Sequence, residues 1–551
     1  ALRAHGAQVQ RLLWASVGTK NPKYPDTLYI DELIGPDTVS TMPPATYEAF
    51  RDHGSAQPKL LENLDQARDL IARLELLGIS LDDVTALLLK QGVALFAGSF
   101  EQLMGSIRQK REMMLDRKRS GQSFLPSRYD KVMREGLDKL ASEQALPRFW
   151  AKEATLWKTE AEHTKIIANS LGWLEVAKLV RQHAGELTSF ADEIAAAGFR
   201  HVVLMGMGGS SLCPEVLRRT NIPMAGHPEL LVLDSTVPAT VRRIQSAIDP
   251  ARTLFVVASK SGSTKEPSVF YAYFFDLVRR LKGDKAGENF VAITDPGTKM
   301  DQDAQRDGFR KIFRNPSDIG GRYSALSFFG MVPAALIGLD VGQLLDRAIA
   351  VMEQCGPQRP LAENPGAKLG AALGVLALAG RDKVTLVTPP PLEAVGLWIE
   401  QLIAESTGKE GKGIVPIAGE PLGVPPVYGN DRVFVQIRTA NHPAPEVNPL
   451  LRALAQAGHP VFDQTLEGAI DLGAEFFRWE IATPLACWFL NIDPFDQPNV
   501  QESKDNTVAL LKEFTERGRL PEFEPLASFD GLTLSIGPDA RKAFPQPVTP
   551  G

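Results

Sequence analysis

Two short segments combine glycines with hydroxyl side chains in a way that suits phosphate binding. Residues 206–211 read GMGGSS, and residues 259–264 read SKSGST. Glycines let the backbone approach a ligand closely, and the main-chain N–H groups at the start of a helix favour an anion. Short hydroxyls add donors that can surround the three outer oxygens of a phosphate monoester. The two segments therefore predict phosphate-binding loops.

Other interpretations of these segments stay open on the residues alone. A dinucleotide fingerprint needs a third glycine where Ser211 stands, and Asp234 is a weak match for its ribose-binding acid. A Walker A motif is excluded because Gly-Lys-Ser/Thr is absent. The structural alternatives are a tight turn that binds nothing for the first segment and a helix N-cap with a polar surface for the second.

Each segment lies where an apolar strand pattern gives way to a helical one. Strands are predicted at 201–205, 230–233, 254–258 and 290–294, with helices between them. This alternation is typical of a doubly wound α/β sheet, in which neighbouring strand ends converge on one crevice. A helical stretch is predicted before this sheet, at 128–197, and a helical bridge after it, at 324–380. The strands of a second, similar unit are predicted at 383–388, 433–437 and 460–462.

The overall composition excludes several classes of protein. The 551 residues carry 60 basic and 66 acidic side chains, a net charge of −6, so we expect no nucleic acid or anionic membrane bound through global charge. No run reaches the roughly 18 apolar residues of a membrane span. Three well-separated cysteines, Cys213, Cys355 and Cys487, argue against a disulfide framework or a Cys-rich metal site. They indicate a reducing, cytoplasmic compartment.

Five motifs together give a resemblance that no single motif carries. GMGGSS and SKSGST are followed by GGRYS at 320–324, ESTGK at 405–409, and FDQ at 495–497 with Lys504 beyond it. In this order and approximate spacing they resemble glucose-6-phosphate isomerase over about residues 125–520. The resemblance implies two sugar isomerase (SIS) domains, each a doubly wound parallel sheet. It also implies an aldose–ketose isomerase that interconverts glucose 6-phosphate and fructose 6-phosphate.

The resemblance carries the family's site residues to matching positions. Glu405 matches the base that moves a proton between C1 and C2 through a cis-enediol, and Arg322 matches the arginine that stabilises the enediolate. A carboxylate can accept and return the same proton, and a fixed cation counters charge that appears only in the transition state. Lys504 resembles the lysine near the ring oxygen. The implied ligands of the substrate phosphate are Gly209, Ser210, Ser259, Lys260, Ser261, Thr264 and Gln497.

One departure from the family pattern concerns opening of the sugar ring. Better-known members carry a histidine between the Glu and Lys motifs, whereas the comparable residues 472–480 read LGAEFFRWE. His442 and His459 lie upstream in unlike contexts, and we interpret them as loop or strand-start residues. We therefore hypothesise that Glu475 or Lys504 assists ring opening.

The N-terminal segment carries a second resemblance. QRLLWAS, KNPKY, YIDELI and TVSTMP, all within residues 10–43, resemble the last two strand–helix units and terminal helices of transaldolase. That family's Schiff-base lysine and acid–base carboxylates belong to earlier barrel strands, and we interpret Lys20 and Lys23 as loop residues. We expect an incomplete (β/α)₈ barrel without aldol transfer, within a bifunctional fusion whose start lies outside this chain. The expected strands and helices are 9–17, 37–42, 63–77 and 81–115.

These observations combine into one expectation of fold and function. The predicted fold class is α/β: the C-terminal part of a transaldolase barrel (1–120), two SIS domains (121–340 and 341–515), and an irregular, surface-packed tail (516–551). A basic, polar linker is expected at 117–123. The chain would act in glycolysis, gluconeogenesis and the pentose phosphate pathway. A homodimer is a candidate assembly.

The expected ligands are sugar phosphates, with no metal or redox cofactor and no nucleic-acid or membrane partner. Proton transfer through an enediol needs no metal, and no His/Asp/Glu group in the sequence has metal-ligand spacing. Two alternatives stay open: a non-catalytic SIS regulator that senses a sugar phosphate, and an SIS isomerase for another phosphosugar. A sensor needs phosphate ligands but no proton shuttle, so the pair of Glu405 and Arg322 argues against it.

Overall fold

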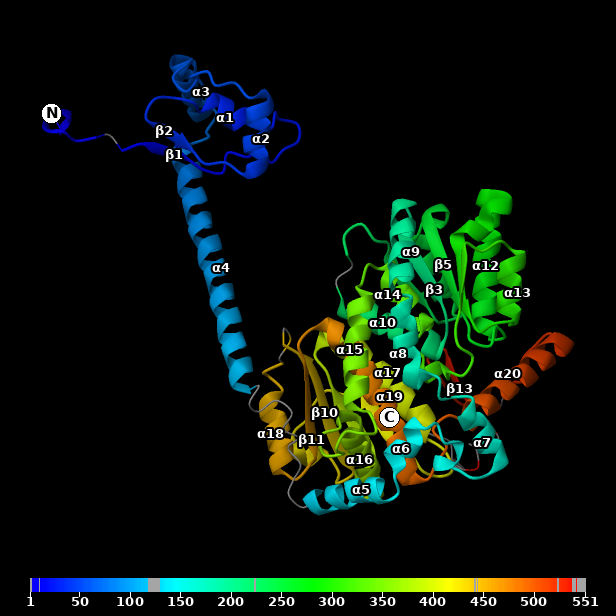
Figure 1. The fold of residues 1–551 in the computed structure, drawn as a ribbon. Coiled ribbons are helices and arrows are strands. Elements are labelled where there is room, and N and C mark those ends of the chain that lie inside the picture. Colours follow the sequence, from blue (N-terminus) through cyan, green and yellow to red (C-terminus); the bar gives the residue numbers. More distant parts are fainter. Residues whose placement is uncertain are drawn as a thin grey trace. The chain divides into compact units, whose positions relative to one another are not determined.

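The chain divides into two compact units, Ala1–Met114 and Leu115–Gly551 (Figure 1). The computed structural model describes residues 2–8, 10–116, 129–221, 224–440, 442, 444–522, 525–537 and 542. The predicted linker at 117–123 lies outside the described residues. Among the helices that are described, none is long and apolar enough to cross a membrane.

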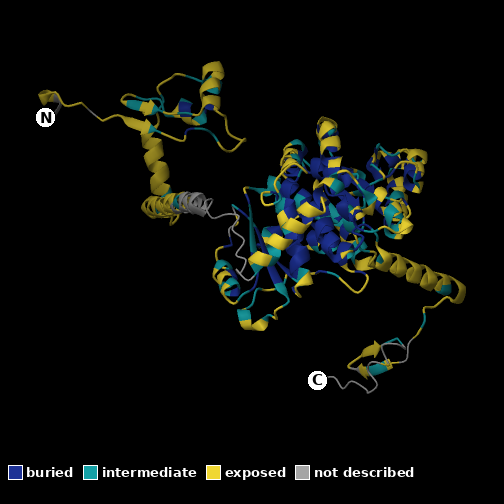
Figure 2. Ribbon diagram, turned by 60° about the horizontal axis from the view of Figure 1, so that its bottom comes forward, coloured by how far each residue is buried: buried dark blue, intermediate teal, exposed yellow. Residues whose placement is uncertain are grey.

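The first unit pairs two short strands in parallel. β1 (Leu12–Trp14) lies beside β2 (Thr38–Ser40), and both are shorter than predicted. Its helices are α1 (Leu28–Glu32), α2 (Pro44–His53), α3 (Leu64–Leu76) and α4 (Leu81–Asp116). Figure 2 shows that most of this unit is exposed, and α3 has no buried residue. The expected strand–helix steps are present, around a small core that includes Val17 and Ile30.

The first half of the second unit holds a five-stranded parallel sheet in the order β4-β3-β5-β6-β7. Its strands are β3 (His201–Met205), β4 (Glu229–Leu233), β5 (Thr253–Ala258), β6 (Phe290–Thr294) and β7 (Lys311–Arg314). The helices of this half are α5 (Asp130–Ser142), α6 (Ala145–Trp150), α7 (Ala161–Ala168), α8 (Trp173–Gln182), α9 (Ala184–Ala196), α10 (Leu212–Thr220), α11 (Pro238–Ala247), α12 (Lys265–Lys282), α13 (Lys299–Arg306) and α14 (Phe328–Leu336). Helices cover both faces of such a sheet, so its central strands are continuous apolar runs.

The polar loops of this half emerge at one edge of the sheet. β3 lies between β4 and β5, so the direction of strand succession reverses there. Residues 206–211 and 259–264 follow β3 and β5 at their carboxyl ends, where doubly wound sheets bind ligands. β7 is not among the predicted strands, because its sequence KIFR is short and partly exposed at the sheet edge.

The second half holds a four-stranded parallel sheet in the order β11-β10-β8-β9. Its strands are β8 (Lys383–Val387), β9 (Val415–Ala418), β10 (Arg432–Thr439) and β11 (Val461–Leu466). The helices are α15 (Val341–Gln354), α16 (Pro365–Leu378), α17 (Glu393–Thr407), α18 (Asn448–Gln456), α19 (Leu472–Leu490) and α20 (Pro498–Arg517). β9 escapes prediction because Pro416 interrupts its short apolar pattern. Two doubly wound parallel sheets confirm the predicted fold class.

Helix α19 joins the two halves into one core. Every residue of α19 except Arg478 is buried, and the helix packs against α15, α16 and α17. The same apolar cluster contains Val202 and Leu254 of the first sheet and Val384 and Val433 of the second. A helix that is apolar on all sides must be enclosed by protein, and α19 therefore holds the halves together (Figure 1).

The segment after residue 518 differs from the predicted irregular tail. β12 (Pro525–Phe529) and β13 (Leu532–Ser535) pair in an antiparallel hairpin, and β13 is exposed along its length. Asp530 and Gly531 connect the strands with φ of 49° and 78°. Asp-Gly with positive φ at both positions is typical of a two-residue hairpin turn, so the sequence did hold a signal for this hairpin.

Candidate active site

The GMGGSS loop packs directly against the GGRYS loop. Gly208–Ser210 form a 3-10 turn after β3, and a Cβ at Gly209 would lie only 2.0 Å from the main-chain oxygen of Gly321. The Ser324 hydroxyl donates to the main-chain oxygen of Gly209 at 3.3 Å. Glycine at 209 therefore permits a backbone approach that no side chain would allow. This contact brings the first predicted phosphate loop to the segment that carries Arg322.

The SKSGST loop presents a buried hydroxyl with unused hydrogen-bonding capacity. Ser259 is 3% exposed, and its Oγ has no hydrogen-bond partner within the described structure. Ser261 and Ser263 are joined by an Oγ–Oγ hydrogen bond of 2.8 Å, across Gly262 with φ of 62°. A buried polar atom normally has a partner, from the protein or from a bound molecule. The Ser259 hydroxyl therefore keeps a hydrogen-bonding position that the described protein groups do not fill.

Lys260 and Thr264 flank these hydroxyls. The Lys260 ammonium donates to Asp295 Oδ2 at 2.8 Å and to the Ser317 main-chain oxygen at 2.9 Å. Burial raises the pKa of Asp295, although the Lys260 ammonium opposes this shift. Thr264 directly precedes α12, so its loop ends at a helix N-terminus. Lys260 is thus a paired cation beside the loop, and Thr264 adds a hydroxyl at the start of the helix.

Arg322 and Glu405 meet where the two halves join. Arg322 is 5% exposed, and Glu405, in the last turn of α17, has a side chain that is 25% exposed. Arg322 Nη1 lies 3.3 Å from Glu405 Oε2, and Arg322 Nε donates to Ser406 Oγ at 2.9 Å. Its Nη2 donates to the main-chain oxygens of Pro494 and Asp496 at 2.7 and 2.9 Å. These bonds fix the guanidinium beside a carboxylate that remains accessible.

Gln401 also belongs to this group, and sequence reasoning missed it. It lies one helical turn before Glu405, and its Nε2 donates to Glu405 Oε1 at 2.9 Å. Gln401 Oε1 is buried without a hydrogen-bond partner in the described part of the chain. A Cβ at Gly208 would lie 2.5 Å from Gln401 Nε2, so the amide lies against the GMGGSS loop. The i, i+4 spacing from Glu405 was the available signal.

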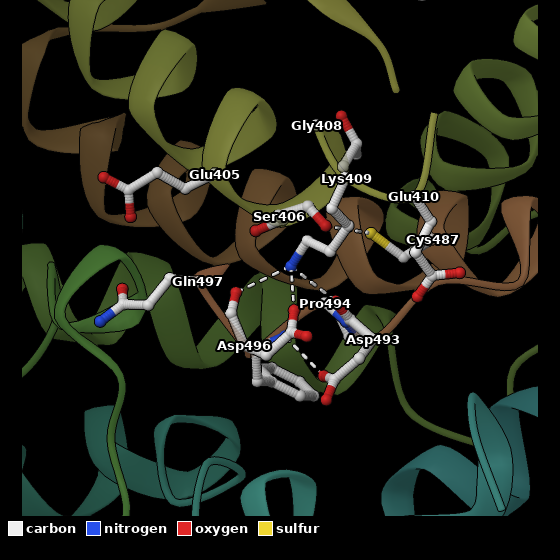
Figure 3. Close-up of polar contacts among 12 residues, drawn as sticks. Glu405, Ser406, Gly408, Lys409, Glu410, Cys487, Asp493, Pro494, Asp496 and Gln497 are labelled. Carbon is white, nitrogen blue, oxygen red and sulfur yellow. Dashed lines mark hydrogen bonds and ion pairs between the residues drawn. The ribbon is translucent and has the colours of Figure 1, made fainter. Parts of the chain in front are cut away.

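The segment Asp493–Gln497 forms the other wall of the site (Figure 3). Gln497 Oε1 accepts a hydrogen bond from Arg322 Nη1 at 3.3 Å, which places this predicted phosphate ligand beside Arg322 and Glu405. The buried Lys409 ammonium donates to the main-chain oxygens of Asp493 and Asp496 and to the Asp496 carboxylate. Lys409 lies within the ESTGK motif but had been given no role from the sequence.

Two of the residues predicted for catalysis lie elsewhere. Glu475 precedes Cys487 on α19 by twelve residues, about 18 Å along a helix, and it is Cys487 that contacts Ser406 beside Glu405. Glu475 instead pairs with Arg478 at 3.3 Å, in the wall of a separate cavity of about 250 Å³. Burial raises the pKa of Glu475. Lys504 lies on α20, which has no buried residue. The structure therefore brings neither Glu475 nor Lys504 into contact with the Arg322–Glu405 pair.

A group with metal-ligand chemistry lies behind the site. One ligand atom each from His163, Asp493 and Asp496 falls within 4.8 Å of the others, a grouping that sequence spacing does not reveal because His163 is distant in the chain. His163 Nδ1 lies 3.0 Å from Asp493 Oδ2, and Lys409 forms an ion pair with Asp496. The Lys409 ammonium group thus already supplies positive charge beside these carboxylates.

Comparison with known families divides the chain as its motifs do. Residues 2–107 match the family model described as Transaldolase/Fructose-6-phosphate aldolase, and residues 175–414 match Phosphoglucose isomerase. The second match includes both predicted phosphate loops, Arg322 and Glu405, and it ends before Gln497 and Lys504. Two separate family matches in one chain confirm both resemblances.

Individual relatives agree with this division. A glucose-6-phosphate isomerase of Rubrobacter xylanophilus is 29% identical over 426 residues, which cover 68% of this chain and 95% of that protein. A transaldolase of Neisseria gonorrhoeae is 49% identical over 107 residues, 19% of this chain and only 30% of that protein. A crystal structure of a glucose-6-phosphate isomerase from Chlamydia trachomatis aligns over 70% of this chain and 86% of its own, with a TM-score of 0.57 at 19% identity, and shows the fold alone.

Proposed function

Because the chain joins a segment of the transaldolase family to a member of the phosphoglucose isomerase family, we propose that it interconverts glucose 6-phosphate and fructose 6-phosphate. The observation that carries the proposal is the 3.3 Å contact between Arg322 Nη1 and Glu405 Oε2 at the edge where both phosphate loops emerge. This arrangement combines a proton acceptor, a fixed cation and an anion site.

The phosphate of the substrate is held by the two loops of the first half. Gly209 and Ser210 approach it from one strand end, and Ser259, Ser261 and Thr264 from the next. The Ser259 hydroxyl, which has no partner among the residues that the structure describes, donates to a phosphate oxygen. Lys260 supports the loop through Asp295, and Gln497 closes the site from the second half.

Glu405 and Arg322 carry out the isomerisation. Glu405 takes a proton from C2 of the aldose and returns it to C1 of the same molecule, through a cis-enediol. Arg322 counters the negative charge that develops on the enediolate oxygens, and its four hydrogen bonds to Ser406, Gln497, Pro494 and Asp496 hold it in place before that charge appears. Gln401 orients the Glu405 carboxylate from the preceding turn. Neither Glu475 nor Lys504 enters this scheme.

The decisive experiment follows glucose 6-phosphate formed from fructose 6-phosphate by coupled reduction of NADP⁺. We expect Glu405→Gln to lower kcat by about 10²- to 10⁴-fold, because the amide cannot accept the proton. Glu400→Gln, on the same helix, is the matched control and should retain activity. Equal activity in wild type and Glu405→Gln would remove Glu405 from the mechanism.

The same assay separates the alternatives. A wild-type chain that binds sugar phosphate without turnover would be a sensor, and one that isomerises only another phosphosugar would be a different SIS enzyme. Combining Glu405 with Arg322 favours the enzyme, because a sensor needs no proton shuttle.

The transaldolase-like segment spans about 30% of the length of the transaldolase relatives that it matches. We propose that aldol transfer requires strands beyond this segment, so this chain should transfer no dihydroxyacetone to erythrose 4-phosphate. Transfer by this chain would contradict that proposal.

Further organisation is also proposed. We place the two SIS domains at 121–340 and 341–515. We propose a homodimer, to be tested by light scattering. Three free, buried cysteines are compatible with a cytoplasmic location.

A further inference from the structure

Lys409 is a buried cation behind the site, and every hydrogen of its ammonium group is used. Its side chain is 2% exposed. Nζ donates to the main-chain oxygen of Asp493 at 2.9 Å, to that of Asp496 at 2.7 Å, and to the Asp496 carboxylate. A lysine ammonium has three donor hydrogens. Lys409 therefore has no donor left for a substrate, which excludes direct catalysis by this group.

Lys409 and Arg322 share one acceptor in this segment. The main-chain oxygen of Asp496 accepts from Lys409 Nζ at 2.7 Å and from Arg322 Nη2 at 2.9 Å. The next residue, Gln497, accepts from Arg322 Nη1 at 3.3 Å. Figure 3 shows the Lys409 ammonium reaching the segment that carries Asp493, Pro494 and Asp496. One short segment thus connects Lys409 to Arg322.

The segment has further anchors from separate parts of the chain. His163 Nδ1, on α7, lies 3.0 Å from Asp493 Oδ2, and Phe495 N donates to Asp493 Oδ1 at 2.8 Å. Burial lowers the pKa of Lys409, and the ion pair with Asp496 opposes that shift. Removing the ammonium would take the Lys409 donor from the Asp493 main-chain oxygen and from the Asp496 carboxylate, and it would leave the Asp496 main-chain oxygen with Arg322 as its donor. The segment would then have to move to find new partners.

We propose that Lys409 is a positioning residue for the isomerisation, which fixes the segment Asp493–Gln497 and, through it, Arg322 and Gln497. The inference rests on the proposed function, because it assigns Lys409 a role in the same reaction. Arg322 acts on charge that exists only in the transition state, so its displacement lowers kcat. Gln497 contacts bound substrate, so its displacement raises KM.

Lys409→Met tests the inference, because methionine keeps an unbranched side chain and removes the ammonium. We expect kcat/KM to fall about tenfold to a hundredfold, as small misplacements of catalytic groups do. The matched control is Lys412→Met. Lys412 lies in the same loop and donates to the main-chain oxygen of Leu490 at 2.9 Å, outside the Asp493–Gln497 segment. It should lose less than about threefold, with a comparable change in melting temperature.

A double-mutant cycle separates positioning from general destabilisation. If Lys409 acts through Arg322, Lys409→Met should change kcat little once Arg322→Met is present, because coupled residues are not additive. A purely structural role predicts the same fold-loss in both backgrounds, and that result would overturn the inference. If Lys409→Met does not fold, Lys409→Gln, which keeps two donor hydrogens, goes through the same cycle. An inactive wild type would instead reject the proposed function, whereas an active wild type with unchanged Lys409→Met rejects only the positioning role.

Discussion

The two parallel sheets of the second unit have similar layouts but different carboxyl edges. In the first sheet, β3 and β5 are followed by loops rich in glycine and hydroxyl groups. In the second, β8 is followed by residues 388–393, which read TPPPLE. This sheet contributes to the site through the last turn of α17, which carries Glu405, and through the segment after α19. Two sheets of similar layout therefore contribute different parts of one candidate site.

This division of labour has a physical basis. Phosphate needs several donors close together, which glycine-containing loops at strand ends supply. A proton-transfer group needs one fixed position, which a helix within a packed core supplies. Arg322 comes from the first half, and its guanidinium is bound by groups of the second half. Substitutions at this junction should therefore have larger effects than substitutions at either edge.

The largest effect is expected at the junction itself. Arg322→Met should lower kcat about 10²- to 10³-fold, because it removes the cation to which we assign stabilisation of the enediolate. Steady-state kinetics with fructose 6-phosphate measure this loss, and the melting temperature checks that the fold persists. Loss confined to KM would show that Arg322 only binds substrate and would contradict its assignment.

A smaller effect is expected at the edge of the first sheet. Ser259 directly follows β5, and Thr388 directly follows β8 at the equivalent edge of the second sheet. Ser259→Ala should raise KM about tenfold through loss of one phosphate hydrogen bond, whereas Thr388→Ala should leave KM unchanged. Equal effects of the two variants would break the comparison between the sheets.

The shared core gives a prediction for pH. Burial raises the pKa of Glu480, which lies on α19 beside the main chain of Ala325, well above the value of about 4.3 for an unfolded chain. The folded state then binds this proton more tightly than the unfolded state does. The contribution of Glu480 to the free energy of unfolding is therefore complete below about pH 4 and declines as the pH rises through the folded-state pKa.

Glu480→Gln removes this titration. Relative to wild type, the variant should be more stable at pH 8 than at pH 5, by an amount on the order of 1 kcal/mol. Urea unfolding at the two pH values measures the difference. Glu502→Gln, on exposed α20, serves as the control. A difference that does not depend on pH would show that Glu480 is ionised in the folded chain.

The smallest effect on turnover is expected from Glu475. Glu475→Gln should change kcat and KM by less than about twofold. The reason is that Glu475 lies about 18 Å along α19 from Cys487, the residue of this helix that contacts Ser406 beside Glu405. A loss of turnover on cyclic substrate alone, with open-chain substrate unaffected, would restore its hypothesised role in ring opening.

The strands, loops and family motifs that depend on local sequence pattern could be predicted from the sequence. Strand 201–205 and its glycine loop were readable because a buried parallel strand is a continuous apolar run. Both family resemblances were confirmed because they depend on ordered motifs. β7 and β9 were missed because both edge strands are short, KIFR has a charged residue at each end, and VPIA contains a proline.

The site was less predictable where it depends on long-range contacts. His163 and Asp493 are distant in sequence, and only the fold brings them together. The position of Glu475 away from the Arg322–Glu405 pair could not be predicted, because a sequence position does not say which end of a buried helix lies at the site. Lys409 lies in the ESTGK motif, but its contact with Asp496 depends on how the chain packs within the second half. Gln401 lies outside the motifs, one helical turn before Glu405.

The three buried cysteines have a consequence for observing how the second unit opens. Cys213 lies in α10, Cys355 follows α15, and Cys487 lies in α19 beside Ser406. Burial raises the pKa of Cys355 and of Cys487 to about 12, so little reactive thiolate exists in the closed state. A thiol reagent can therefore modify them only during transient opening. The labelling rate of each cysteine, measured by mass spectrometry, would report how often the structure around that cysteine opens. All three rates would come from one unaltered chain.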